Sequence, residues 1–237
     1  NLHFISLSKK CKKIITIHDL SFEHYPEFFS WKRRYWHKFI NPRNLLKQFD
    51  QIISVSENTK NDLINLYNIN LNKIKVVYSG SPGSGRDQGL EPRAKELRFV
   101  KNKYDLPNKF ILYLGTLEPR KNIASLIEAF AQLKLDDYKL IIAGAKGWLY
   151  QDILKLIKKT KNVQYIGYID SKDKPALYNL ASIFIYPSFY EGFGFPVLEA
   201  MKYSCPVITS LNSSLLEIAG DTALLVDPYR IDDLKQA

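Results

Sequence analysis

The feature that most constrains this fold is a regular alternation of short apolar runs with longer amphipathic stretches. Such alternation is typical of parallel β-strands joined by crossover helices, so it predicts an α/β architecture. Nine runs are predicted to be strands, which is too many for one small lobe. The runs span residues 13–17, 51–55, 74–78, 110–114, 140–143, 163–166, 183–186, 207–209 and 223–226.

A segment rich in glycine and serine, residues 79–89, separates the third run from the fourth. It holds no large apolar side chain, as is typical of linkers. We therefore predict two domains, residues 1–85 and residues 86–237. The charge divides in the same way, because residues 1–85 carry 13 of the 34 lysines and arginines but only 6 of the 24 acidic residues.

Composition excludes several classes of protein. With 46% hydrophobic and 24% charged residues the chain is neither disordered nor collagenous. No apolar run reaches the roughly 18 residues of a membrane helix. The net charge of +10 indicates an anionic partner such as nucleic acid, a phosphate ligand or an acidic membrane. Cys11 and Cys205 lie far apart without metal-type spacing, which favours a reducing, cytoplasmic setting.

Two helices are predicted directly after strands. In residues 122–130 the apolar side chains recur at helical spacing on one face, as in a helix packed on a sheet. Ser56, followed by polar-apolar alternation through Leu66, predicts a helix capped at its N-terminus. Ligands of such folds bind at the carboxyl ends of the strands, so the turns after the runs are where a site is expected.

The first informative turn, residues 115–122, places Arg120 and Lys121 at or just before a helix N-terminus. The helix dipole disfavours cations there. A bound phosphate would accept the free helix N–H groups and interact with both charges, which would remove this penalty. The alternative is that both side chains are solvated at the surface.

The second turn follows residues 183–186 and carries two glycines and two acids. Gly192 and Gly194 allow close backbone approach or positive φ, and Pro196 suits the first turn of a helix. Glu191 lies in the loop and Glu199 one turn into the predicted helix. A carboxylate near a helix start can hold the two hydroxyls of a ribose.

The N–H groups of Val197 and Leu198 are expected to be exposed, where they could meet phosphate. Alternatively, the glycines only make a tight turn and the acids complement the helix dipole. Paired carboxylates also occur in glycosidases. We prefer nucleotide binding, because the surroundings suit phosphate.

Residues 191–201, Glu-Gly-Phe-Gly-Phe-Pro-Val-Leu-Glu-Ala-Met, resemble the Glu-x7-Glu signature of retaining glycosyltransferases of family 4. The resemblance implies the GT-B fold, in which two Rossmann-like, doubly wound parallel-sheet domains face a cleft. Residues 118–122, Glu-Pro-Arg-Lys-Asn, are closest in style to mannosyltransferase-like members. Further motifs in the family's order lie at residues 17–20, 26–27, 55–57, 76–78, 115–122, 142–144 and 225–228.

The resemblance also predicts truncation. The first domain lacks the family's opening strands and its glycine-rich loop, and the second domain lacks the final crossover helix. The chain starts without Met, and residues 231–237 read as the start of a helix. We therefore expect a piece of a longer protein, with a partial acceptor-side domain and a nearly whole donor-binding domain.

The resemblance implies roles for individual residues. Glu199 would bind the ribose of a nucleotide sugar, and Glu191 would contact hydroxyls of the donor sugar. Lys121 matches the family's lysine on the diphosphate. His18 matches a histidine that projects from the first domain toward the donor sugar.

Arg120 would supply the second charge, because the position where many members have an arginine is Thr116 here. Ile166 and Gly167 are expected to border the base. The other residues expected to bind substrate are Gly115, Thr116, Gly192, Phe193, Gly194, Phe195, Val197 and Leu198.

The implied enzyme moves a sugar from a GDP- or UDP-sugar, GDP-mannose first, to an acceptor hydroxyl with retention, in cell-surface polysaccharide or glycolipid synthesis. No Asp-x-Asp motif is found, so cations are expected to replace a metal, and no cofactor is expected. The alternatives are a non-catalytic nucleotide-sugar-binding fragment and a GT-B sugar-nucleotide epimerase. Nucleic-acid binding ranks last, because no recognition motif accompanies the charge.

The basic first segment has two interpretations. Lys9, Lys10, Lys12 and Lys13, with the Trp-Lys-Arg-Arg-Tyr-Trp run at residues 31–36, could lie against an anionic membrane that carries lipid-linked acceptors. The alternative is a solvated surface. The first interpretation predicts a cytoplasmic protein peripheral to the inner face of a membrane.

Overall fold

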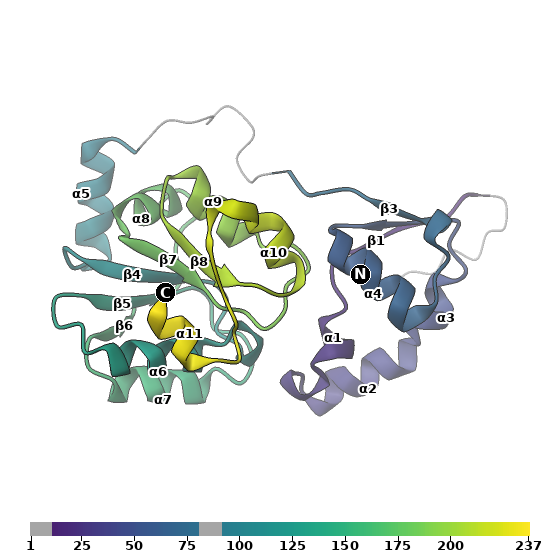
Figure 1. The fold of residues 1–237 in the computed structure, drawn as a ribbon, viewed down its shortest axis with the longest axis horizontal. Coiled ribbons are helices and arrows are strands. Elements are labelled where there is room, and N and C mark those ends of the chain that lie inside the picture. Colours follow the sequence, from purple (N-terminus) through teal and green to yellow (C-terminus); the bar gives the residue numbers. More distant parts are fainter. Residues whose placement is uncertain (1–10, 81–91) are drawn as a thin grey trace. The chain divides into compact units, whose positions relative to one another are not determined.

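The computed structural model of the chain describes residues 11–80 and 92–237 (Figure 1). Contacts divide the chain into two units. The first comprises Asn1–Ser79 with Glu191–Phe193, and the second comprises Gly80–Tyr190 with Gly194–Ala237. The predicted boundary between residues 85 and 86 lies outside the described residues.

The first unit is built on a parallel sheet in the order β1-β2-β3. A small core of aliphatic side chains and Tyr67 packs around Leu63 and Ile52. Ser56 caps α4 as predicted, since its Oγ accepts a hydrogen bond of 3.1 Å from the backbone N–H of Thr59. The elements are β1 (Ile14–Ile17), α1 (Ser21–His24), η1 (Pro26–Phe28), α2 (Trp31–Ile40), α3 (Pro42–Leu46), β2 (Gln51–Ser54), α4 (Glu57–Tyr67), η2 (Leu71–Lys73) and β3 (Ile74–Val76).

The second unit contains a six-stranded parallel sheet in the order β6-β5-β4-β7-β8-β9. The first three strands extend the sheet to one side and the last three to the other. This is the strand order of the doubly wound dinucleotide-binding fold, and its switch point lies between β4 and β7. The strands are β4 (Phe110–Leu114), β5 (Lys139–Ala143), β6 (Val163–Tyr165), β7 (Ile183–Tyr186), β8 (Val207–Ser210) and β9 (Leu224–Val226).

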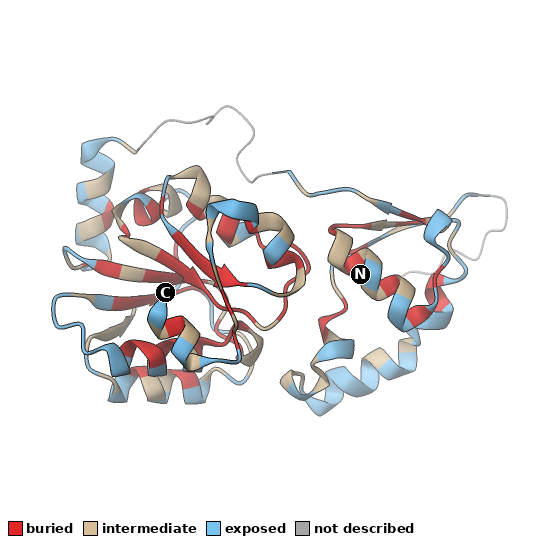
Figure 2. Ribbon diagram, viewed as in Figure 1, coloured by how far each residue is buried: buried red, intermediate tan, exposed pale blue. Residues whose placement is uncertain are grey.

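Helices cover both faces of this sheet. In the view of Figure 1, α6, α7 and α11 lie below the strands, and α8, α9 and α10 lie above them. Figure 2 shows that the buried residues concentrate in the strands and in the helix faces turned toward them. The helices are α5 (Ala94–Lys103), η3 (Pro119–Lys121), α6 (Ile123–Leu133), α7 (Gln151–Lys159), α8 (Lys174–Leu180), α9 (Phe195–Lys202), α10 (Ser213–Ala219), η4 (Gly220–Thr222) and α11 (Ile231–Gln236).

All nine predicted strands are confirmed, with ends that differ by at most two residues. The predicted helix at residues 122–130 is also confirmed, and its apolar face is buried. It begins at Ile123 rather than at Asn122, because Asn122 closes the preceding 3-10 turn with a left-handed φ of 56°. The short helix predicted near residue 231 is α11.

Candidate active site

Two turns flank the switch point of the second sheet. They follow β4 and β7, which pair directly through Ile111 with Ile183 and Leu112 with Phe184. The turns are bonded to each other, because Phe189 N donates to Arg120 O at 2.9 Å. They are the two turns that the sequence singles out, and the carboxyl ends of neighbouring strands bring them together.

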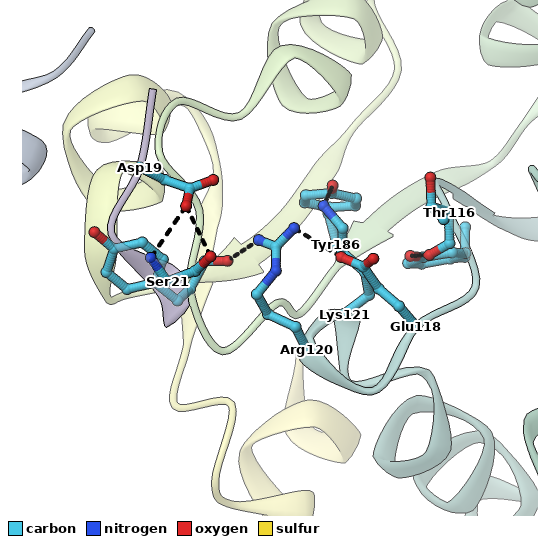
Figure 3. A network of polar contacts seen from close by, with 9 residues as sticks. Asp19, Ser21, Thr116, Glu118, Arg120, Lys121 and Tyr186 are labelled. Atoms are coloured by element: carbon cyan, nitrogen blue, oxygen red, sulfur yellow. Dashed lines mark hydrogen bonds and ion pairs between the residues drawn. The ribbon is translucent and has the colours of Figure 1, made fainter. Parts of the chain in front are cut away.

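The side chain of Lys121 reaches the Tyr186 side chain instead of solvent (Figure 3). Lys121 is only 7% exposed, and its Nζ donates a hydrogen bond of 2.6 Å to the Tyr186 hydroxyl. The same ammonium lies 5.1 Å from the centroid of the Tyr186 ring. That ring stacks on Tyr113, with centroids 5.8 Å apart. The alternative of a solvated lysine is therefore wrong.

Arg120 joins the two turns. Its Nη2 forms an ion pair of 2.7 Å with Oε1 of Glu118, and its Nη1 donates to the carbonyl oxygen of Tyr190 (Figure 3). The side chains of Arg120 and Glu118 are 11% and 3% exposed. The alternative that Arg120 is solvated at the surface is therefore also wrong. Glu118, which the sequence interpretation left out, balances the guanidinium charge, and a role of Arg120 toward a diphosphate stays a prediction.

Glycines end three neighbouring strands at the same edge. Gly115, Gly144 and Gly167 follow β4, β5 and β6, and Gly144 N donates to Gly167 O at 2.8 Å. Gly144 has a φ of 132°, and a Cβ there would lie 2.0 Å from Gly115 O. The predicted residues Thr116 and Ile166 adjoin this row and are half-buried. The backbone is tightly packed here, since Gly144 is buried and its carbonyl oxygen accepts a hydrogen bond of 2.8 Å from the Tyr165 hydroxyl.

The helix after β7 begins where the Gly-x-Gly motif predicts. Gly194 has a φ of 116° and precedes α9, whose first turn contains Phe195 and Pro196. The expectation of an exposed amide at Val197 is wrong, because its N–H donates to Gly194 O at 3.0 Å. This bond closes the first turn of the helix. Leu198 is half-buried in the next position.

Glu199 lies one turn farther along α9, and its side chain is 14% exposed. Both of its carboxylate oxygens lie 3.1 Å from Nζ of Lys174. Oε2 also accepts a hydrogen bond of 2.9 Å from the Tyr178 hydroxyl. Burial raises the pKa of Tyr178, and the negative charge of Glu199 raises it further, so the phenol keeps its proton.

His18 and Glu191 belong to the first unit. His18 directly follows β1 and is exposed, and the next residue, Asp19, accepts hydrogen bonds from the N–H and the hydroxyl of Ser21 (Figure 3). The division by contacts groups Glu191, Gly192 and Phe193 with this unit, and all three are buried. Lys121, Arg120 and Glu199 belong to the second unit.

Across residues 11–80 and 92–237, no group of three or more His, Cys, Asp or Glu side chains is placed to hold a metal ion. Within the same residues, no helix combines the length and the apolar character that crossing a bilayer demands.

Comparison with known families identifies the chain's relatives. Residues 94–237 match the family described as "Glycosyl transferases group 1". The chain belongs to this glycosyltransferase family. Residues 2–81 match "Glycosyltransferase Family 4", which is the resemblance that the motifs predict.

Curated relatives of this glycosyltransferase chain include mannosyltransferases. It is 35% identical over 230 residues to the O-antigen chain mannosyltransferase B of Escherichia coli, covering 93% of this chain and 58% of that protein. It is 28% identical over 207 residues to a serotype-specific mannosyltransferase WbdA of Escherichia coli, covering 84% of this chain and 25% of that protein. The chain thus spans little more than half of the first relative and a quarter of the second.

Solved glycosyltransferase structures share the fold. The sucrose-phosphate synthase of Thermosynechococcus elongatus matches with a TM-score of 0.75 and 24% identity, over 94% of this chain and 57% of that one. Anabaena HepE, solved with UDP-glucose, matches with a TM-score of 0.76 and 21% identity, over 94% of this chain and 60% of that one. The predicted GT-B fold is confirmed.

Proposed function

We propose that this chain is the donor-binding part of a retaining glycosyltransferase. The enzyme moves a sugar, mannose first among the candidates, from a nucleoside diphosphate to an acceptor hydroxyl in cell-surface polysaccharide synthesis. The observation that carries the proposal is the junction of two turns at the β4/β7 switch point, with Lys121 hydrogen-bonded to Tyr186. The mannosyltransferase relatives support the choice of sugar.

Each part of the donor has a group of suitable chemistry. Lys121 offers a positioned cation for the diphosphate. Glu199 offers carboxylate oxygens for the ribose hydroxyls. Ile166 and Gly167, directly after β6, are the residues proposed to border the base, and a Cβ at Gly167 would meet no atom within 4 Å. Donor selection among bases then rests on backbone contacts.

The reaction breaks the bond between the anomeric carbon and a diphosphate oxygen. Negative charge grows on the departing diphosphate, and Lys121, assisted by Arg120, stabilises it without a metal ion. The acceptor hydroxyl attacks from the face of the leaving group, and its proton passes to the departing phosphate oxygen. The new bond therefore keeps the anomeric configuration. Glu191 and the backbone of Gly194 and Phe195 are proposed to hold the sugar hydroxyls, and a role of His18 toward the donor sugar stays a prediction.

Calorimetric titration of the purified chain tests the proposal. GDP-mannose, UDP-glucose, GDP and UDP are titrated into wild-type chain and into the Lys121→Met and Glu199→Gln variants, with and without EDTA. We expect donor binding that EDTA leaves unchanged and that each substitution weakens about tenfold or more. Unaltered affinity in both variants would reject the site, and abolition by EDTA would reject metal independence. The anomeric configuration of the product, read by NMR, tests retention.

We also propose that α2 rests on the inner, cytoplasmic face of an anionic membrane. No residue of α2 is buried. Trp31, Tyr35 and Phe39 recur every four residues along one face and are 73%, 70% and 81% exposed. By helical geometry Lys32 flanks this aromatic stripe on one side and Arg34 with Lys38 on the other. Aromatic rings flanked by cations suit the headgroup region. Lys9 and Lys10 lie outside the described residues.

Flotation with vesicles tests the α2 proposal. Wild-type chain is expected to float with vesicles that contain phosphatidylglycerol and much less with neutral phosphatidylcholine vesicles. Replacing Lys32, Arg34 and Lys38 by Gln is expected to abolish that preference. The control replaces Lys155, Lys158 and Lys159 of α7 by Gln, which removes the same charge elsewhere and leaves flotation intact. Equal flotation with both vesicle types would refute the proposal.

A further inference from the structure

We propose that Lys174 and Tyr178 of α8 are positioning residues for Glu199. They orient its carboxylate so that it can accept both hydroxyls of a nucleotide ribose. The inference rests on the proposed function, because it takes Glu199 to be the ribose ligand. It extends that function to two residues of a helix outside the Glu-x7-Glu motif.

The geometry fixes the carboxylate in two directions. Nζ of Lys174 lies 3.1 Å from both oxygens, so it bridges them and sets the plane of the group. The Tyr178 hydroxyl, 2.9 Å from Oε2, fixes which oxygen lies toward α8. A carboxylate has about four acceptor positions, so acceptor capacity remains for a ligand.

Tyr178 is itself immobilised. Its side chain is fully buried, meets the Phe184 ring edge-on at 5.3 Å and stacks on Tyr203 at 6.3 Å. The raised pKa of this phenol means that it donates to the carboxylate throughout the working range of pH. The hydrogen bond to Glu199 is therefore held by the core and not by a mobile surface group.

The start of α8 is fastened from the other side. Asp173, directly before Lys174, is buried and lies 2.6 Å from Nζ of Lys103. It also accepts a hydrogen bond of 2.9 Å from the Tyr104 hydroxyl. Lys103 is the last residue of α5, and Tyr104 directly follows this helix. The end of α5 therefore anchors Asp173 and with it the start of α8, where Lys174 lies.

Glu199 remains reachable by a ligand. Lys174, Tyr178 and Glu199 line a hollow of about 970 Å³ between α5, α8 and α9. Ordering a flexible Glu side chain on binding would lower affinity through lost rotamer freedom. The two donors from α8 order it beforehand, so the ribose meets a carboxylate that is already in place.

The test compares nucleotides that differ only in the ribose. GDP and 2′,3′-dideoxy-GDP, with UDP and 2′,3′-dideoxy-UDP as a second pair, are titrated calorimetrically into the whole chain. Lys174→Met is expected to weaken binding of the ribonucleotide about tenfold and of its dideoxy analogue less than about twofold. Tyr178→Phe should act in the same direction, and Lys174→Arg should restore most of the affinity. The control Lys172→Met removes a neighbouring charge and should change neither.

The outcomes separate this inference from the function beneath it. If the wild-type chain and the Glu199→Gln variant each bind the ribonucleotide and its dideoxy analogue with equal affinity, Glu199 does not bind the ribose. The inference then fails together with that role. If Glu199→Gln abolishes the discrimination while Lys174→Met and Tyr178→Phe preserve it, the function stands and the inference is overturned. Equal weakening of both nucleotides by Lys174→Met, with melting temperature unchanged, also overturns it, because Lys174 would then act on the phosphates.

Discussion

Lys121 donates a hydrogen bond of 2.6 Å to the hydroxyl of Tyr186, a residue 65 positions later in the chain. Lys121 ends the turn after β4, and Tyr186 is the last residue of β7. The bond therefore crosses the switch point of the sheet. The position of this cation depends on strand order as much as on its own turn.

Replacing Lys121 by Met removes the charge while keeping a side chain of similar length. We expect the dissociation constant of GDP to rise about tenfold or more, because a charge-assisted contact to phosphate is lost. GMP should lose less affinity, since it lacks the second phosphate. Titration calorimetry measures both, and the melting temperature controls for folding. Equal losses for GMP and GDP would contradict a role at the diphosphate.

The ion pair of Arg120 with Glu118 should show strong coupling. Glu118→Gln leaves a buried guanidinium without its counter-charge and is expected to lower the free energy of unfolding by about 3 kcal/mol. The double variant Glu118→Gln with Arg120→Met should recover most of this loss, because neither charge is then isolated. Urea unfolding of the two single variants and the double variant measures the coupling. Additive losses would show that the pair is not a unit.

Much of the architecture follows from local pattern. Buried parallel strands are nearly continuous apolar runs, so the sequence predicts strands such as Phe110–Leu114 and Ile183–Tyr186 directly. Ser56 and Pro196 mark helix starts through capping and fixed φ, which are properties of single residues. The two turns of the candidate site follow directly from these elements.

The partners of the charged side chains could not be predicted in this way. Glu199 meets Lys174 and Tyr178 only because α8 packs beside α9, and sequence spacing does not encode that packing. Arg120 and Lys121 resemble surface cations in a turn, yet Lys121 is buried and the side chain of Arg120 is only 11% exposed. The Gly-x-Gly motif predicts an exposed amide at Val197, but this N–H donates to Gly194 O in the first turn of α9.

Gly115 should tolerate no side chain. A Cβ at this position would lie 2.8 Å from the Tyr113 hydroxyl oxygen and 3.2 Å from Cε2 of Tyr186. Gly115→Ala is expected to lower the free energy of unfolding by about 1–3 kcal/mol through overpacking. Adding Tyr113→Phe removes the nearest clashing atom and should recover part of the loss. Chemical denaturation compares the variants, with Tyr113→Phe alone as the control, and no recovery would disprove the steric cause.

Asp173 should make stability depend on acid pH. Burial alone would raise the pKa of this carboxyl, but the hydrogen bonds from Lys103 and Tyr104 outweigh it and hold the pKa below its usual 3.8. A carboxylate whose pKa is lower in the folded state than in the unfolded state stabilises the protein at pH values above its unfolded-state pKa. This contribution to stability is lost as the pH falls through the folded-state pKa.

Thermal unfolding between about pH 6 and about pH 3 measures this dependence. The melting temperatures of wild-type chain and of the Asp173→Asn variant should therefore differ near pH 6, and the difference should shrink as the pH falls below 3.8 toward the lowered folded-state pKa. Lys103→Met removes the ammonium donor, so burial dominates and raises the pKa of Asp173 above its unfolded-state value. In this variant a fall in pH should favour the folded state at this carboxyl instead of destabilising it. Parallel curves for wild type and Asp173→Asn would show that this carboxylate does not fasten α5 to α8 through its charge.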